Sequence, residues 1–321
     1  MTTVVDLAPN TGVGRSLLRP LGVSELRVFP LAMSGNVFGW TADGEATNSI
    51  LDAYREVGGN FVDTADSYAG GRSEIMIGNW MRDRRNRDDM IIATKIGKSA
   101  NNPGLSARAI KRAVTDSLER LRTNYIDLVY LHIDDPDVPF DETLLAIDEL
   151  IRSGTVRYFG ASDHTVNRLI EARIASAQLG VAQLVALQNQ YNLLARTGYE
   201  GPLANVAANQ GLGVMPRFAL ASGFLTGKYR TKADLAKHPR GAEAATYFNR
   251  KNQRVVAALD AIARDKDSSV ASVALAWLLT KPNVVAPVVS ASKASQVAEL
   301  AQAATLNLSR QHLSELDRVS A

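Results

Sequence analysis

Three strand-like segments of the sequence each end in a residue that can hold or transfer a proton. They end in Asp63, Lys95 and His132, and Tyr68 lies in the loop that follows Asp63. A parallel α/β barrel places its chemistry at the carboxyl ends of its strands, so these four side chains are expected to meet. A tyrosine can act as a general acid when a nearby cation lowers its pKa, and Lys95 supplies that cation. Asp63 can hold Lys95 in place, and His132 can donate a hydrogen bond to a carbonyl oxygen.

Each of these residues also has an ordinary structural interpretation. Asp63 can cap the turn that follows it, Lys95 can be solvated, and His132 can be a structural histidine. For any one residue taken singly the structural interpretation is favoured. Four such residues at and beside successive strand ends favour a catalytic group instead.

Apolar segments alternate with segments of helical period along the whole chain. Eight strands alternating with helices predict a parallel sheet with right-handed crossovers, and a closed barrel leaves no exposed sheet edge. No Gly-x-Gly-x-x-Gly motif follows the first strand, so the doubly wound dinucleotide-binding fold is not indicated. Two short apolar segments within residues 16–29 predict a β-hairpin, and residues 1–16 are expected to form a loose N-terminal tail. Strands are predicted near residues 28–35, 61–63, 91–95, 127–132, 156–161, 184–188, 213–216 and 284–289, and helices near 47–57, 73–84, 106–121, 141–153, 165–179, 201–210, 250–264, 269–280, 293–301 and 309–319.

The composition narrows the classes of function. The chain has 321 residues, 46% of them hydrophobic, and one barrel domain over residues 1–321 accounts for that length. The absence of cysteine excludes disulfides and thiolate metal sites, and the four histidines show no metal-ligand spacing, so no metal is expected. The net charge of +3 is scattered, which predicts no nucleic-acid partner. No apolar run is long enough for a membrane span and no signal peptide is evident, so we expect a cytoplasmic protein.

The four residues fall at the spacing of a known catalytic tetrad. Asp63, Tyr68, Lys95 and His132 resemble the tetrad of the aldo-keto reductase superfamily, and the resemblance extends from residue 19 to residue 296. The chain is most similar to bacterial members related to the potassium-channel β-subunits. The resemblance implies a (β/α)8 TIM barrel, an N-terminal β-hairpin that closes its bottom, extra C-terminal helices, and NADPH (NADP⁺) as cofactor.

The resemblance also assigns residues at strand ends to the nicotinamide. Ser162 and Gln188 match the residues that hold its carboxamide, while Asp163 stands where the family usually has Asn. Asp163 can cap the following helix or contact the cofactor, and the two roles are compatible. Arg217 stands where many relatives have an aromatic residue on the nicotinamide face, so its guanidinium either stacks there or is a surface arginine.

Two further segments resemble the family's phosphate-binding regions. Glycines in the loop after the seventh strand let backbone N–H groups approach a pyrophosphate. After the eighth strand, Ser292 and Lys293 resemble the groups that hold the 2′-phosphate, which favours NADPH over NADH, and Leu300 replaces a common adenine-contacting Asn. The remaining expected cofactor contacts are Gly35, Asn36, Asp63, Phe218, Leu220, Ser222, Gly223, Leu225, Gly227, Lys228, Arg240, Ser290, Gln296 and Glu299.

The predicted function is therefore reduction of an aldehyde or ketone by NADPH, with Tyr68 as the general acid. Trp40, Tyr68 and His132 are the expected substrate contacts, and Phe38 and Trp40 are both expected to be exposed at the barrel mouth. A nucleotide-binding regulatory subunit and a sugar or polyol dehydrogenase working oxidatively are the alternatives. The expected partner is a small-molecule carbonyl compound, and the sequence sets no oligomeric state.

Overall fold

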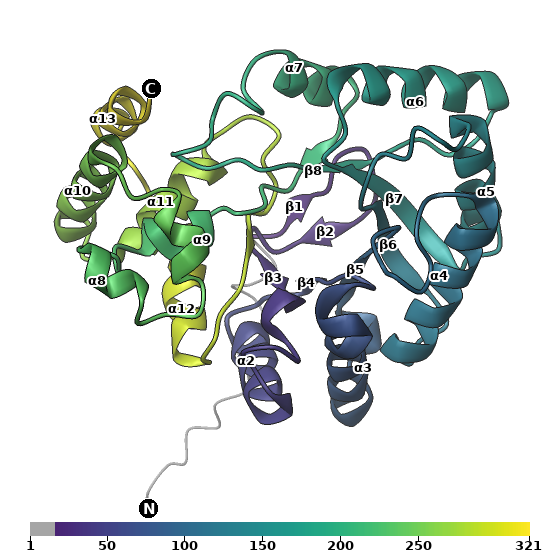
Figure 1. The fold of residues 1–321 in the computed structure, drawn as a ribbon, viewed down its shortest axis with the longest axis horizontal. Helices are drawn as coiled ribbons and strands as arrows, with labels where there is room; N and C mark the ends of the chain where they lie inside the picture. Colours follow the sequence, from purple (N-terminus) through teal and green to yellow (C-terminus); the bar gives the residue numbers. More distant parts are fainter. Residues whose placement is uncertain (1–16) are drawn as a thin grey trace, which may run out of the picture.

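The computed structural model describes residues 17–321, and the predicted tail, residues 1–16, lies outside the described residues. Strands and helices alternate from β3 to α7, and helices predominate after β9 (Figure 1). The strands are β1 (Arg19–Pro20), β2 (Arg27–Val28), β3 (Ala32–Ser34), β4 (Phe61–Asp63), β5 (Ile91–Ile96), β6 (Ile126–Leu131), β7 (Val156–Ser162), β8 (Ala186–Gln188), β9 (Gly213–Val214) and β10 (Val288–Val289). The helices are α2 (Gly44–Glu56), α3 (Arg72–Arg84), α4 (Ala107–Leu121), α5 (Phe140–Arg152), α6 (Val166–Leu179), α7 (Pro202–Asn209), α8 (Lys232–Leu235), α9 (Gly241–Ala245), α10 (Arg250–Asp265), α11 (Val270–Leu279), α12 (Ser295–Ala301) and α13 (Arg310–Ser320).

Eight parallel strands form the central sheet in the order β10-β3-β4-β5-β6-β7-β8-β9. The segment that leads into β10 closes this sheet against β9. Val285 N donates to Val214 O at 2.9 Å, and Val288 N donates to Pro216 O at 2.8 Å. The predicted (β/α)8 TIM barrel is therefore confirmed, with its closure made by main-chain hydrogen bonds between residues 214–216 and residues 283–288.

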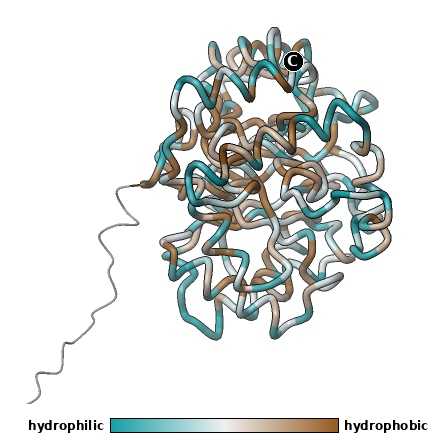
Figure 2. The backbone as a smooth tube through the Cα atoms, turned by 90° about the vertical axis from the view of Figure 1, so that its left-hand side faces the viewer, coloured by the Kyte–Doolittle hydropathy of each residue, from teal (hydrophilic) through white to brown (hydrophobic). Residues whose placement is uncertain are grey.

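The helices surround the strands because each buries one apolar stripe. In α4 the buried residues recur every three or four positions, at Ile110, Ala113 or Val114, Ser117 and Leu121. Ser106 caps the start of this helix by accepting from Ala109 N. Figure 2 shows the resulting pattern, with hydrophobic backbone segments toward the interior and hydrophilic segments toward the outside.

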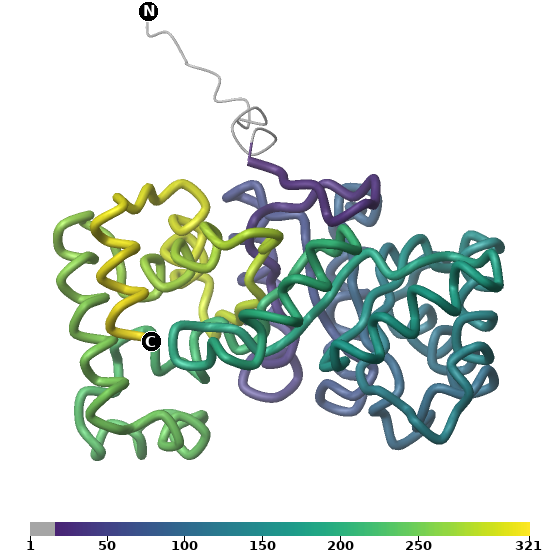
Figure 3. The backbone as a smooth tube through the Cα atoms, turned by 90° about the horizontal axis from the view of Figure 1, so that it is seen from above, coloured from purple at the N-terminus to yellow at the C-terminus, as the bar shows by residue number. Residues whose placement is uncertain are grey.

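The hairpin of β1 and β2 closes the end of the barrel at which the strands begin. Leu21, Leu26 and Val28 are buried in the same apolar cluster as residues of the barrel interior. Gly22 has φ +55, and a Cβ there would lie 2.3 Å from Val185 O, so the turn requires glycine. Figure 3 shows the hairpin on one side of the molecule and the α8–α9 segment on the other.

Three details differ from the sequence prediction. Val28 pairs with Arg19 in the hairpin, so the first barrel strand begins at Ala32 rather than at residue 28. Phe38 is completely buried, because the turn after β3 folds it into the core, whereas Trp40 is 54% exposed as predicted. The short helices α8 and α9 form in a polar stretch whose periodicity predicted no helix.

Among residues 17–321, none of the helices has the length and apolar character needed to cross a membrane.

Candidate active site

The structure brings the side chains of the predicted tetrad together at the carboxyl ends of β4, β5 and β6. Lys95 Nζ donates to Asp63 Oδ2 at 2.5 Å and to the backbone oxygen of Thr64 at 2.7 Å. The same Nζ lies 4.9 Å from the centre of the Tyr68 ring. The Tyr68 and His132 rings meet edge to face, with centroids 6.2 Å apart. The parallel register explains this grouping, because Asp63 pairs with Ala93, two residues before Lys95, and Lys95 with Tyr130, two residues before His132.

Burial makes the Asp63–Lys95 pair an electrostatic unit. Both side chains are 1% exposed, so neither charge is stabilised by bulk water. Burial is the largest single effect and lowers the pKa of Lys95, but Asp63 and Tyr68 together outweigh it, and the net pKa lies above the usual value. Lys95 is therefore a permanent cation beside Tyr68 at neutral pH.

The pKa of Tyr68 moves in the direction opposite to the predicted one. Burial raises it, the positive charge of Lys95 lowers it, and burial is the larger effect. The phenol is therefore fully protonated at neutral pH in the protein alone. A protonated phenol beside a cation is a proton donor rather than a base.

His132 is a neutral side chain in this site. Burial and the positive charges of Lys95, Lys98 and Arg217 lower the pKa of His132 to about 2. Its Nδ1 is buried and makes no hydrogen bond to the described residues. A neutral imidazole next to Tyr68 can donate one N–H hydrogen bond to an oxygen without transferring a proton.

An unusual turn orients Tyr68. Ala69, Gly70 and Gly71 follow it with φ of 50, 65 and 89, so three successive residues adopt left-handed conformations before α3 begins. Glu74, fully buried in the first turn of α3, accepts from Thr94 Oγ1 at 2.5 Å and from Arg120 Nε at 2.6 Å. These bonds fasten the start of α3 to β5 and α4, which fixes the loop that carries Tyr68.

Unpaired polar atoms line the neighbouring strand ends, where a carboxamide is expected. Ser162 Oγ, at the end of β7, is buried and makes no hydrogen bond to the described residues, and the same holds for Asn36 Oδ1. Gln188, at the end of β8, is 1% exposed and donates from Nε2 to Asp63 Oδ1 at 2.9 Å. Buried polar groups without partners are rare, so these atoms fit a polar ligand such as the nicotinamide amide.

The two departures from the family pattern contact each other. Arg217 donates to Asp163 from Nε at 3.1 Å and from Nη2 at 2.6 Å. This bidentate pair joins the end of β7 to the segment after β9 and is about one-third exposed. The interpretation of Asp163 as a helix cap is wrong, because Thr165 caps α6 by accepting from Arg168 N. Arg217 is likewise not a free surface arginine.

The loop after β9 adopts the glycine-dependent conformation that the sequence suggested. Its backbone is left-handed at Phe218, Ser222, Gly223 and Gly227, and Leu220 and Leu225 anchor it against the core. Ser222 Oγ donates to Glu243 Oε2 at 3.1 Å, so helix α9 lies against this loop. Arg240, in the segment between α8 and α9, has its guanidinium 5.9 Å from the Trp40 ring centre.

Lys228 and Arg240 lie close enough to affect one another. Burial and the positive charge of Arg240 lower the pKa of Lys228. Two neighbouring cations beside a turn with left-handed glycines suit an anionic ligand.

The start of α12 already holds an acceptor oxygen. Gln296 Oε1 accepts from Ser292 N at 2.8 Å, from Ser292 Oγ at 3.1 Å and from Lys293 N at 3.2 Å. Three donors thus converge on one oxygen at the exposed position where a 2′-phosphate is expected, and Lys293 and Glu299 remain exposed. Ser290 lies just after β10, between the barrel and this turn.

Comparisons with known proteins fit this geometry. A family model described as the aldo/keto reductase family matches residues 32–321. The chain belongs to the aldo/keto reductase family. A probable voltage-gated potassium channel subunit beta of Oryza sativa subsp. japonica is 35% identical over 291 residues, covering 87% of this chain and 88% of that protein.

Two fungal enzymes are also similar to this aldo/keto reductase. Norsolorinic acid reductase B of Aspergillus parasiticus is 29% identical over 316 residues, covering 92% of this chain and 81% of that protein. Aldo-keto reductase ausK of Aspergillus calidoustus is 31% identical over 336 residues, covering 97% and 83%. The family is thus shown by near-complete matches to reductases as well as to a channel subunit.

Sequence reasoning missed two charged residues of this aldo/keto reductase. Asp66 lies between Asp63 and Tyr68, is 2% exposed, and neither carboxylate oxygen has a hydrogen-bond partner among the described residues. Burial and nearby Glu74 raise the pKa of Asp66 to about 7. Lys98, three residues after Lys95, is near enough to lower the pKa of His132. The sequence positions of Asp66 and Lys98 did not indicate a role, because an acid or a lysine in a loop is ordinarily solvated.

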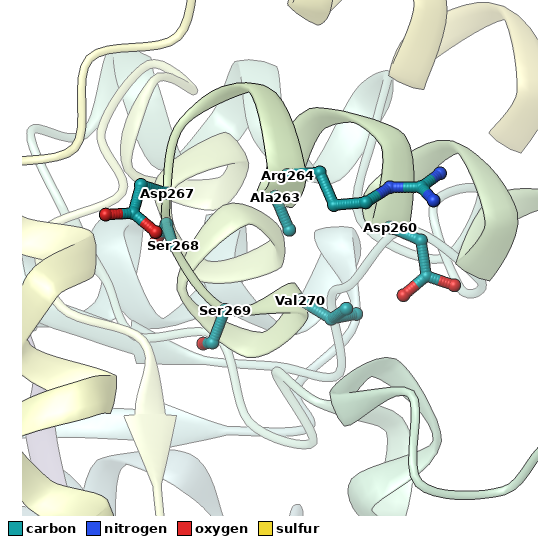
Figure 4. A pocket seen from close by; sticks show the side chains of 7 residues that line it. All are labelled: Asp260, Ala263, Arg264, Asp267, Ser268, Ser269 and Val270. Atoms are coloured by element: carbon teal, nitrogen blue, oxygen red, sulfur yellow. The ribbon is translucent and has the colours of Figure 1, made fainter.

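One surface pocket is lined by none of the expected site residues. It lies between the end of α10 and the start of α11 and is lined by Asp260, Ala263, Arg264, Asp267, Ser268, Ser269 and Val270 (Figure 4). Asp260 forms an ion pair with Arg230, and Ser269 caps α11 by accepting from Ser272 N. Within residues 17–321, no three His, Asp or Glu side chains are grouped so that they could hold a metal ion.

Proposed function

We propose that this protein is an NADPH-dependent reductase of an aldehyde or ketone. The observation that carries the proposal is the contact of Lys95 with both Asp63 and the Tyr68 ring, beside a neutral His132. When bound, NADPH supplies the hydride. The residues of the chain then need to bind the carbonyl oxygen and give it a proton.

Tyr68 and His132 divide these tasks. Tyr68 donates the proton, and Lys95 stabilises the phenolate that forms, because its cation lies 4.9 Å from the ring. His132, held neutral by burial and by nearby cations, donates a hydrogen bond that orients the substrate oxygen. Asp63 keeps Lys95 in place through its 2.5 Å contact.

In the protein alone, Tyr68 is in the protonation state from which carbonyl reduction starts. Alcohol oxidation begins with removal of the hydroxyl proton, which requires a phenolate at this position. Burial raises the pKa of Tyr68, so the phenol keeps its proton at neutral pH and acts as a donor.

Ser162, Asn36 and Gln188 are proposed to hold the nicotinamide amide. Ser162 Oγ and Asn36 Oδ1 are buried and have no hydrogen-bond partner in the described part of the chain, which supports a polar ligand there. Ser292 and Lys293 are proposed to hold the 2′-phosphate, because their donors already converge on the oxygen of Gln296. The loop of residues 218–228 and Arg240 are proposed to hold the pyrophosphate.

A nucleotide-binding regulatory role is the second candidate, supported by the similarity to the channel subunit beta of Oryza sativa subsp. japonica. Both functions would use the same cofactor residues, so cofactor binding alone does not separate them. A complete group of Asp63, Tyr68, Lys95 and His132 supports turnover, which a purely regulatory subunit does not need.

Tyr68→Phe tests the proposal directly. The variant removes only the hydroxyl, so turnover of a reactive aldehyde, followed by the loss of NADPH absorbance, is expected to fall about 10²–10⁴-fold. The dissociation constant of NADPH, measured by protein fluorescence, is expected to change little. Turnover within a few-fold of the wild type would rule out Tyr68 as the proton donor.

A further inference from the structure

One hydrogen bond crosses the interior of the barrel at the level of the tetrad. Asp63 ends β4 and Gln188 ends β8, and these strands are four positions apart in the closed sheet of eight, on opposite sides of the barrel. Gln188 Nε2 nevertheless donates to Asp63 Oδ1 at 2.9 Å. Both residues are at most 1% exposed. A charge-assisted bond in such a dry setting is strong.

The bond uses the carboxylate oxygen that Lys95 leaves free. Lys95 occupies Oδ2 of Asp63, and Gln188 occupies Oδ1. The amide of Gln188 has one possible orientation here, because the reverse would place two acceptor oxygens 2.9 Å apart. The carboxylate is therefore held from both sides and cannot rotate without breaking one of the bonds.

We propose that Gln188 is a positioning residue for the catalytic group, which holds Asp63 and through it keeps Lys95 beneath Tyr68. The expected role of Gln188 was contact with the carboxamide alone. One of the two N–H groups of the Gln188 amide is committed to Asp63, and its carbonyl oxygen can accept from the N–H of a carboxamide. Ser162 is a donor for the carboxamide oxygen, because its hydroxyl is buried and makes no hydrogen bond to residues 17–321.

This arrangement joins cofactor recognition to proton donation through one side chain. When a carboxamide N–H donates to the oxygen of Gln188, it withdraws electron density from the Gln188 amide. The hydrogen bond from Gln188 Nε2 to Asp63 then becomes stronger. Binding of the cofactor then fixes Asp63, and through it Lys95, more firmly in position. The inference rests on the proposed function for its catalytic part, but the contact itself is testable in the protein alone.

The first experiment uses cofactor-free protein and the variant Gln188→Glu. This change keeps the side-chain size but places a second carboxyl beside Asp63, and carboxylates that share a site raise one another's pKa. The variant is expected to lose folding stability relative to the wild type as pH rises from 4 to 8. Each unit by which the new carboxyl's pKa rises corresponds to a tenfold loss in the folding equilibrium constant, and we expect at least about tenfold.

Gln190→Glu is the matched control for that experiment. Gln190 lies two residues further along the same segment, and its Nε2 donates at 3.1 Å to the neutral hydroxyl of Tyr247 instead of to a carboxylate. Denaturant unfolding of both variants at pH 5 and pH 8 compares them. A pH-dependent loss confined to Gln188→Glu supports the contact, and equal pH dependence in both variants overturns it.

The second experiment separates positioning from cofactor binding. Gln188→Leu removes the amide, so turnover at saturating NADPH and aldehyde is expected to fall at least about tenfold. In Gln188→Glu, turnover is expected to recover as pH is lowered, because the protonated carboxyl can donate to Asp63. A residue that only binds the carboxamide would raise the NADPH dissociation constant and leave saturated turnover within about threefold, which would overturn the inference. A wild type that reduces no aldehyde would refute the proposed function instead, and the stability comparison would still decide whether Gln188 holds Asp63.

Discussion

Replacing Lys95 by methionine separates the structural and catalytic contributions of the Asp63–Lys95 pair. The Lys95 charge lies 4.9 Å from the Tyr68 ring centre. Taking that distance as the separation between Nζ and a phenolate, an effective dielectric near 20 gives an attraction of about 3 kcal/mol. Its loss removes the positive charge that lowers the pKa of Tyr68, so that pKa rises further and the phenol becomes a weaker proton donor.

The same substitution leaves a buried carboxylate without its partner. Asp63 is 1% exposed, and breaking a buried pair by removing one member costs about 3–5 kcal/mol of folding stability. The double variant Asp63→Asn/Lys95→Met removes both charges and is expected to recover most of this loss. Turnover stays low in the double variant, because the cation near Tyr68 is still absent.

The assay measures saturated aldehyde turnover and denaturant unfolding for the wild type, Lys95→Met and the double variant. We expect turnover to fall about 10²-fold in both variants, as about 3 kcal/mol of lost stabilisation of the phenolate implies. Stability is expected to fall only in the single variant. Recovery of turnover together with stability in the double variant would show that Lys95 acts through folding alone, and would refute the electrostatic argument.

Three further changes test the surrounding site. Lys293→Ala is expected to raise the dissociation constant of NADPH about tenfold or more and to leave NADH almost unchanged, because a charge-assisted contact contributes roughly 1.5–3 kcal/mol; an equal loss for both in fluorescence titrations would contradict this. Arg217→Tyr leaves the Asp163 carboxylate uncompensated and is expected to tighten NADP⁺ relative to NADPH, whereas Asp163→Asn leaves the guanidinium and is expected to do the reverse; an unchanged affinity ratio in both titrations would show that the pair does not face the ring. Asp66 has a pKa raised to about 7 in the folded protein, so native protein keeps a proton that the unfolded chain releases, and stability contributed by this site falls as pH rises from about 4 to about 7. Asp66→Asn is therefore expected to raise the midpoint of thermal unfolding at pH 8 but not at pH 4, and an equal change at both values would exclude Asp66 as the titrating group.

The grouping of the tetrad was predictable because parallel strands end at one edge. Once Asp63, Lys95 and His132 are assigned to consecutive strand ends, the register brings their side chains together. The (β/α)8 fold followed for the same reason, since the alternation of strand and helix patterns extends over the whole chain. These features depend on order and period, which the sequence displays directly.

The remaining features depend on contacts between distant segments, which no local pattern contains. Asp163 and Arg217 were each recognised as departures, but their bidentate pairing across 54 positions needed the structure. The burial of Phe38 and the upward pKa shift of Tyr68 likewise arise from what surrounds each ring. Residue type and spacing do not specify how much water a side chain loses on folding.

The strands of the barrel differ in length around its circumference, so some neighbouring strands share fewer hydrogen bonds than others. β5, β6 and β7 are six or seven residues long, whereas β9 and β10 are two each, and the closure between them consists of a few main-chain hydrogen bonds. The segments proposed to hold the pyrophosphate and the 2′-phosphate leave the barrel at this short seam. A ligand bound to both segments would hold them together, so release of the cofactor would require the hydrogen bonds between residues 214–216 and residues 283–288 to open locally. The rate of cofactor release would then depend on how readily these hydrogen bonds open.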